Sequence, residues 1–272
     1  MNGFGTWTAI RLSQGGRSIS CWRGQGASGN RTLFVAGPCP SSMDLAWELS
    51  EKGLFPDGAS VLVASQSSGR GQLGRPWHSP AGNLYGTVRL LPLLPEWGGL
   101  APLLLAEAAL EVLGGLGLVA EIKWPNDVLV RRKKVGGILL EERSGVVMAG
   151  IGLNLTAAPD SGVLRGPQAM PAGFLKEFGV DISPPDMWLR LVDEIGFRMG
   201  EVLSSRKPRD VVMNLESHLA YMGEKVVVEA SEAAACPATV LGLHVSGGIR
   251  VLTAQGERVF CAGSIYPAVG QR

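Results

Sequence analysis

Residues 121–155 read EIKWPNDVLVRRKKVGGILLEERSGVVMAGIGLNL, and this stretch by itself indicates a β-sheet. Four short apolar segments are separated by turn residues, so we expect strands over 121–124, 128–131, 137–141 and 146–153. Residues 128–134 fit a hairpin that returns Lys134 to the turn at residues 123–127. The stretch therefore predicts consecutive short strands with lysines gathered at one turn.

The sequence on either side adds further strands and the helices. Ser41 and Ser42 precede apolar residues at helical spacing, which predicts an N-cap and a helix of two to three turns. Upstream strands are expected over 32–36, 60–64 and 83–91, and helices over 103–113, 172–178, 187–202 and 210–219, with loops filling most of 156–185. Residues 1–31 have weak periodicity, and their role stays open.

From residue 223 onward the pattern changes to short alternating strands separated by glycine turns. Strands are expected over 225–229, 238–245, 249–253 and 258–261. So many short strands in about fifty residues predict a small barrel. We expect two domains, residues 1–221 and 222–272. The fold class is α+β, in which helices flank a mixed sheet in the larger domain and the smaller domain is all β.

Composition excludes several classes of protein. Hydrophobic residues make up 46% and charged residues 18% of the 272 residues, so the chain has enough apolar material for a core. The net charge of +1 gives no overall attraction to nucleic acid or membranes. Four separated cysteines indicate reduced thiols in a cytoplasmic protein. The apolar stretch 100–118 contains Glu107 and Glu111, which predict a polar stripe on a core helix rather than a membrane span.

The strongest chemical signal is GRGQLGRPW at residues 69–77. It contains the G-x-G-x-x-G pattern of dinucleotide sites, but Pro76 and Pro80 prevent the helix that such a site requires. A loop with two arginines remains. Its glycines let the backbone approach a ligand, and its guanidinium groups suit phosphate or carboxylate. The alternative is a solvated turn.

A second signal lies in the opening stretch. Lys123 and Asp127 flank a turn, and Lys134 enters an apolar strand ahead of two glycines that would let a ligand lie against the backbone. An ordinary hairpin tip is the alternative. Asn154 is placed in an apolar strand, where its amide suits an adenine edge or, equally, neighbouring backbone.

Together these segments resemble the biotin–protein ligase family. The matching motifs are GRGQLGR (69–75), WHSPAGNLY (77–85), KWPND (123–127), KVGGIL (134–139) and GIGLNL (150–155). The resemblance covers roughly residues 33–267 and implies a biotin–lipoate ligase fold, similar to class II synthetases, with a C-terminal SH3-like β-barrel. It implies ATP-dependent activation of biotin to biotinyl-5'-AMP, followed by transfer to a lysine of a biotin carboxyl carrier protein.

The resemblance also assigns roles to residues. Lys134 and Arg70 correspond to catalytic positions. The biotin-binding positions are Ser41, Ser42, Met43, Gln66, Arg70, Gly71, Gln72, Lys134 and Gly137. The nucleotide-binding positions are Arg75, Trp77, Lys123, Asn126, Asp127 and Asn154. No protein metal site is expected, because Mg²⁺ would be held mainly by the ATP phosphates.

Two departures from the family pattern affect the expectations. Gln72 replaces the usual arginine of the loop, which predicts a loop that opens more readily unless Arg70 or Arg75 anchors it. The N-terminal segment does not match a helix-turn-helix, so we expect no DNA binding. The protein is expected to be a monomer or homodimer without membrane association. A related lipoate or other-acid ligase, or a weakly catalytic sensor of biotin or biotinyl-AMP, remains an alternative.

Overall fold

The computed structural model describes residues 4–14, 17–26, 31–159, 170–230 and 233–268. The chain divides into two compact units, each made of several segments. The first unit comprises Met1–Pro92, Val135–Pro159 and Gly173–Met199, and the second comprises Leu93–Lys134, Asp160–Ala172 and Gly200–Arg272. The α+β class is confirmed, because a mixed sheet with helices and a separate antiparallel sheet are both present. The division of the chain at residue 221 stays a prediction.

The first unit is organised on a mixed sheet. Its neighbouring strands are antiparallel except for β3 and β4, which run parallel with Val35 opposite Leu62. β8 contributes to this unit from Val135 onward. In order across the sheet the strands are β1 (Phe4–Gln14), β2 (Arg17–Gly26), β3 (Thr32–Cys39), β4 (Ser60–Gln66), β5 (Leu84–Arg89), β9 (Val146–Leu153) and β8 (Lys133–Arg143).

The β1–β2 hairpin was not expected from the sequence, which placed the first strand at residues 32–36. The two strands pair antiparallel, with Ile10 opposite Cys21 and Leu12 opposite Ile19. Leu12, Ile19 and Cys21 are buried, whereas Ser18 and Ser20 are exposed. This alternation is the signal of a half-buried strand. It was present in the sequence but is short and surrounded by Gly, Ser and Arg.

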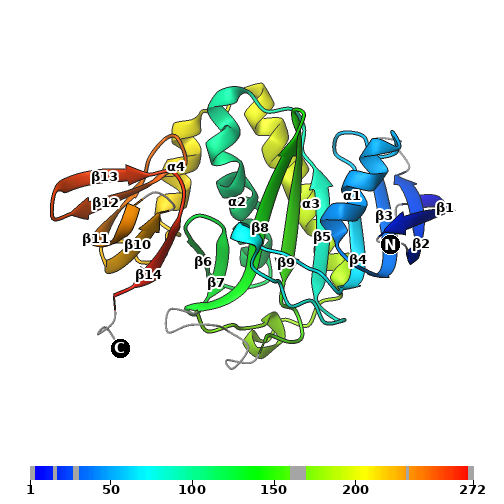
Figure 1. Ribbon diagram of the computed structural model, residues 1–272, viewed down its shortest axis with the longest axis horizontal. Coiled ribbons are helices and arrows are strands. Elements are labelled where there is room, and N and C mark those ends of the chain that lie inside the picture. The colour runs from blue at the N-terminus through cyan, green and yellow to red at the C-terminus, as the bar shows by residue number, and fades with distance from the viewer. Residues whose placement is uncertain (1–3, 15–16, 27–30, 160–169, 231–232, 269–272) are drawn as a thin grey trace. The chain divides into compact units, whose positions relative to one another are not determined.

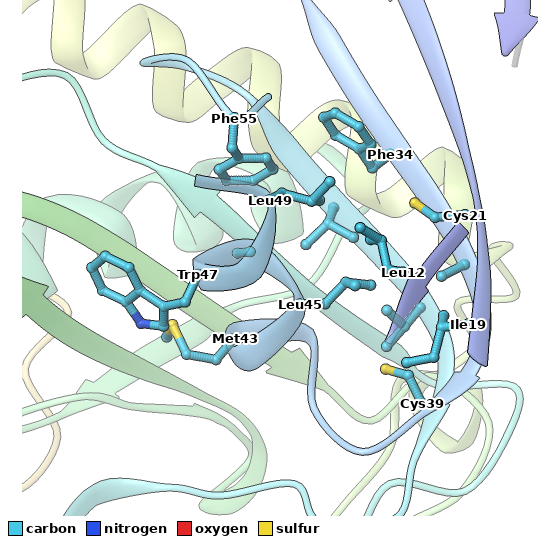
Figure 2. Packing of buried hydrophobic residues seen from close by; sticks show 14 of the residues in the cluster. Leu12, Ile19, Cys21, Phe34, Cys39, Met43, Leu45, Trp47, Leu49 and Phe55 are labelled. Atoms are coloured by element: carbon cyan, nitrogen blue, oxygen red, sulfur yellow. The ribbon is translucent and has the colours of Figure 1, made fainter. Parts of the chain in front are cut away.

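The predicted helix behind Ser41 is confirmed as α1 (Ser42–Glu51). Ser41 is its N-cap and accepts a hydrogen bond from the backbone N–H of Asp44. α1 packs against β4 and β5 on one face of the sheet (Figure 1). Figure 2 shows Leu45 and Leu49 of α1 directed toward Leu12 and Phe34 of the strands, and all four belong to one buried cluster. Burial of this apolar face holds α1, and therefore its N-terminus, against the sheet.

The opposite face of the sheet is covered by α3 (Pro184–Ser204), which follows a short 3-10 helix at Leu175–Phe178. Trp188 of α3 is fully buried against Gly86 of β5, and a Cβ added at Gly86 would lie 2.6 Å from the Trp188 ring. Successive residues of a strand point to opposite faces. Thr87, the next residue, contacts Ser42 of α1, so the two helices lie on opposite faces of β5.

Gly86→Ala is expected to destabilise the fold by about 1–3 kcal/mol, the usual cost of overpacking a core. Gly114→Ala is the matched control, because Gly114 is a helical residue with nothing within 4 Å of its added Cβ. That change should be neutral or stabilise by up to about 1 kcal/mol, since alanine favours helix. Urea unfolding of the two variants measures both effects. Equal midpoints for Gly86→Ala and wild type would contradict the packing described here.

The second unit combines three helical segments, a hairpin and a five-stranded antiparallel sheet. The helical segments are a 3-10 helix at Pro95–Leu100, α2 (Ala101–Gly115) and α4 (Pro208–Glu216), and the hairpin is β6 (Ala120–Lys123) with β7 (Asp127–Val130). The sheet order is β13-β12-β11-β10-β14. Its strands are β10 (Lys225–Ala230), β11 (Ala233–Leu243), β12 (Ile249–Thr253), β13 (Gly256–Phe260) and β14 (Ser264–Pro267). The predicted C-terminal strands are confirmed, and their SH3-like assignment stays a prediction.

The apolar segment Pro95–Gly115 is long and apolar enough to cross a membrane, but 61% of its most apolar window is buried in the fold. The prediction of a polar stripe on this helix is wrong for Glu107. Glu107 does not face solvent: it is 7% exposed, and both its oxygens accept hydrogen bonds from Arg206 at 2.5 and 2.7 Å. A buried carboxylate requires such a partner, and the sequence did not reveal the pair.

Candidate functional site

Several residues predicted for the biotin side lie together at the N-terminus of α1 in the first unit. Gln66, at the end of β4, uses both ends of its amide. Its Oε1 accepts from the backbone N–H of Ser42 at 2.8 Å, and its Nε2 donates to Ser79 Oγ at 3.0 Å. Ser42 Oγ lies 3.0 Å from Thr87 Oγ1. The start of α1 is thus hydrogen-bonded to β4 through Gln66 and to β5 through Thr87. These contacts place polar side chains next to the buried apolar core.

Arg70 belongs to the same cluster. Its guanidinium group contacts Ser41 and Asp44 of the α1 N-terminal segment and Glu141 of β8. These hydrogen bonds, those to Asp44 first, raise the pKa of Arg70 above its usual value despite partial burial. The contacts with Asp44 and Glu141 were not expected. No local signal marks either carboxylate, because Asp44 and Glu141 lie 26 and 71 residues away from Arg70 in the sequence.

The remaining loop residues occupy the surface of the first unit. Gln72 begins a one-turn 3-10 helix over Gln72–Gly74, and Leu73 and Arg75 are exposed. Trp77 packs over β9, where a Cβ added at Gly152 would lie 2.7 Å from its indole.

Met43 is buried, and Gly137 pairs with Gly152 in the β8–β9 ladder. A Cβ at Gly136 would lie 2.2 Å from Leu153, so that glycine is required for packing between strands.

In the second unit, Asp127 joins two lysines. Its Oδ1 is 2.5 Å from Lys134 Nζ, and its Oδ2 is 2.9 Å from Lys123 Nζ. The expectation that the hairpin returns Lys134 to the 123–127 turn is confirmed. Burial by itself raises the pKa of Asp127, but the two ammonium groups outweigh it and hold the pKa below its ordinary value. Two cations on one buried carboxylate leave a net positive charge, which suits a phosphate or carboxylate ligand.

The C-terminal sheet of the second unit contacts this lysine cluster directly. Lys123 Nζ lies 5.4 Å from the centre of the Tyr266 ring in β14, within the range of a cation–π interaction. Trp124, which is buried, donates from Nε1 to the carbonyl oxygen of Gly247 at 2.9 Å. Asn126, between these residues and Asp127, is half-buried. The hairpin turn that holds the predicted nucleotide-side residues Lys123, Asn126 and Asp127 is therefore fixed by the small sheet.

Asn154 lies one residue beyond β9 and not inside the strand. Its side chain donates from Nδ2 to the carbonyl oxygen of Gly173 at 3.0 Å, which favours the backbone-satisfying alternative for that nitrogen. Sequence reasoning missed Asn83. Its Oδ1 accepts from the backbone N–H groups of residues 155–157, at 2.9 to 3.2 Å, and its Nδ2 donates to Ala157. Asn83 therefore fixes the segment that follows Asn154.

The predicted residues divide between the two units. Lys123, Asn126, Asp127 and Lys134 belong to the second unit and all the others to the first. Among the described residues, no group of three or more His, Cys, Asp or Glu side chains could hold a metal ion. All four cysteines are free, and burial raises the pKa of both Cys21 and Cys39 to about 12. The predicted site residues with charged side chains are Arg70, Arg75, Lys123, Asp127 and Lys134, and the four cations among them can stabilise negative charge.

Comparison with known proteins identifies relatives of this chain. The model of the Biotin/lipoate A/B protein ligase family matches residues 36–156. A biotin–[acetyl-CoA-carboxylase] ligase from Paracoccus denitrificans is 38% identical over 161 residues, covering 51% of this chain and 66% of that protein. The corresponding Mycobacterium tuberculosis protein is 35% identical, covering 49% and 53% respectively. The chain thus aligns with about two thirds or less of these relatives.

Solved structures match a larger share. The biotin protein ligase from Aquifex aeolicus in complex with biotin and ATP superposes with a TM-score of 0.73 at 26% identity. The match covers 86% of this chain and 97% of that one. The similarity therefore extends beyond residues 36–156 to most of the described chain.

Proposed function

We propose that this chain, which matches the biotin/lipoate A/B protein ligase family over residues 36–156, activates biotin with ATP and attaches it to a carrier protein. The lysine pair held by Asp127 is the observation in the structure that carries the proposal. Its relatives are named biotin–[acetyl-CoA-carboxylase] ligases, and the Aquifex aeolicus protein was solved with biotin and ATP. The proposed acceptor is a lysine of a biotin carboxyl carrier protein in a carboxylase, and the proposed location is the cytoplasm.

The proposed reaction has two steps. A biotin carboxylate oxygen attacks the α-phosphorus of ATP, the bond to the β-phosphate breaks, and pyrophosphate leaves. The carrier lysine, as a neutral amine, then attacks the acyl carbon. An amide forms, the amine loses a proton, and AMP leaves. Because the nucleophiles belong to the substrates, the protein supplies orientation and charge stabilisation rather than a catalytic Ser, Cys or His.

We assign the residues accordingly. Lys134 stabilises charge on the biotin carboxylate and the α-phosphate. The residues assigned to the nucleotide are Lys123, Asn126 and Asp127 in the second unit and Arg75, Trp77 and Asn154 in the first. The start of α1 with Ser41, Ser42, Met43 and Gln66 receives biotin, with Gly71, Gln72 and Gly137 beside it. Mg²⁺ would arrive with ATP, bound mainly through the phosphates.

Mass spectrometry provides the direct test of the activity. A biotin carboxyl carrier domain incubated with the protein, biotin and MgATP should gain one biotinyl group on a single lysine. Omission of ATP should prevent the gain. Labelling with lipoate in place of biotin would show a related acid ligase, and binding of biotin without labelling would show a sensor.

The small sheet offers a sharper prediction for the nucleotide side. Tyr266→Leu is expected to raise the KM for MgATP about 2- to 30-fold, because a cation–π interaction contributes about 0.5–2 kcal/mol to the placement of Lys123. The KM for biotin should not change. Phe260→Leu is the control, since the Phe260 ring of the same sheet faces Arg258 instead. Steady-state pyrophosphate release measures both constants, and an equal rise in the two KM values would contradict the assignment.

A further inference from the structure

The guanidinium group of Arg70 has all its nitrogens occupied within the first unit. Nε donates to Glu141 Oε1 at 3.0 Å, and Nη1 donates to Asp44 Oδ2 at 2.9 Å and to Ser41 Oγ at 3.3 Å. Nη2 donates to Asp44 Oδ1 at 2.5 Å and lies 3.0 Å from Glu141 Oε1. A guanidinium has five N–H donors, and these acceptors account for every nitrogen. A phosphate oxygen could bind only by displacing one of them.

The charges around Arg70 also do not favour the binding of an anion. Arg70 faces the carboxylates of Asp44 and Glu141, and Arg143 also contacts Glu141, so two cations and two carboxylates leave this cluster without net charge. Such a cluster has no excess positive charge to attract the anions that this family's reaction brings together. Lys123 and Lys134, by contrast, are two cations on one carboxylate.

We propose that Arg70 is a positioning residue, which fastens the 69–77 loop to α1 and β8 through Asp44 and Glu141 and leaves charge stabilisation to Lys134. The inference rests on the proposed function for its catalytic consequence but not for the clamp itself. It replaces the catalytic role that the family resemblance implies for Arg70.

The loop is built so that one anchor holds both of its ends. Arg70 forms a β-bridge with Pro76, the Gly71 N–H donates to the Arg75 carbonyl at 2.7 Å, and the Trp77 N–H donates to the Gly69 carbonyl at 2.8 Å. The loop is therefore a narrow hairpin whose neck contains Arg70. Gln72 at its tip lacks the charge of the arginine that is usual there, so anchoring falls to the neck.

Glu141 is itself held in place. Its Oε2 accepts from Trp47 Nε1 at 3.0 Å and from Arg143 Nη2 at 3.3 Å, and the Arg143 guanidinium lies 4.5 Å from the centre of the Trp47 ring. Trp47 is buried in α1. The loop neck is thus connected through Glu141 to the packed core.

Hydrogen exchange tests the clamp without any ligand. Glu141→Gln and Asp44→Asn should each speed exchange of the Gly71, Arg75 and Trp77 amides about tenfold or more, the equivalent of one charge-assisted hydrogen bond. Arg143→Gln is the control, because it removes a guanidinium from the other oxygen of Glu141 without contacting the loop. Unchanged exchange in both carboxylate variants would overturn the clamp.

Adenylate kinetics test the consequence for catalysis. Arg70→Gln, Glu141→Gln and the double variant should release preformed biotinyl-AMP at the same raised rate, about tenfold or more above wild type. Their maximal rates of pyrophosphate release should stay well above that of Lys134→Ala. If Arg70→Gln abolishes adenylation while Glu141→Gln retains wild-type rates, Arg70 acts on the phosphate and the proposal is wrong. A wild-type protein that forms no biotinyl-AMP would overturn the proposed function instead, and hydrogen exchange would still decide the clamp.

Discussion

Lys134→Ala is expected to reduce adenylate formation about 100- to 1000-fold, the loss that follows removal of one preorganised group facing developing charge. Lys134 sits on Asp127 at 2.5 Å, and its side chain is 29% exposed, so its removal opens little space in the core. Asp127 keeps Lys123 as a partner at 2.9 Å. The free energy of unfolding should therefore change little. Pyrophosphate release at saturating biotin and MgATP is the measurement.

The adjacent lysine supplies the control for this variant. Lys133 precedes Lys134 in β8, and neighbouring strand residues point to opposite faces. Lys133→Ala removes the same charge one position away and should stay near the wild-type rate. If Lys134→Ala remains within about threefold of wild type, a barrier change under ~1 kcal/mol, the catalytic assignment of Lys134 is wrong.

Asp127→Asn is expected to destabilise the second unit by about 3–5 kcal/mol, the cost of leaving a buried ion pair without one partner. The Lys123 side chain is only 5% exposed and pairs with Asp127 at 2.9 Å. Without the carboxylate, its buried ammonium group faces a neutral amide. The combined variant Lys123→Met with Asp127→Asn should recover most of the loss, because it removes the unpaired charge. Urea unfolding of the three variants gives the comparison.

The same interaction predicts a pH dependence. The pKa of Asp127 in the folded protein lies below its ordinary value of 3.8. A lowered folded-state pKa contributes stability that is complete above the unfolded value and is lost as pH falls through the folded value. The difference in unfolding free energy between wild type and Asp127→Asn should thus be constant near neutral pH and shrink below about pH 4. A difference that grows in acid would contradict the pairing.

Local sequence patterns correctly predicted most of the helices and strands and one tertiary contact, between Lys134 and Asp127. The strands after residue 121 and the helix behind Ser41 follow from spacing and turn residues, which act within a few positions. The return of Lys134 to Asp127 also follows, because a two-strand hairpin with a short turn fixes which residues face each other. The resemblance to the family added biotin and ATP as the expected ligands.

The N-terminal hairpin marks the limit of that approach. Ile19 and Cys21 alternate with the exposed Ser18 and Ser20, but β2 has few apolar residues, and it pairs along both edges, with β1 and with β3. Sequence pattern underestimates a strand when its stability comes from the neighbouring strand rather than from its own residues.

Only the tertiary structure decided the partners of the charged groups. Arg70 and Glu141 are 71 residues apart, and Arg206 and Glu107 are 99 apart. Nothing within a few positions of either arginine distinguishes a free cation from a neutralised one. The sequence alone therefore predicted the residues of the candidate site, and these assignments stay predictions. Packing of distant elements, which brings specific carboxylates within hydrogen-bond distance, decided that Lys134 keeps net positive charge around it while Arg70 does not.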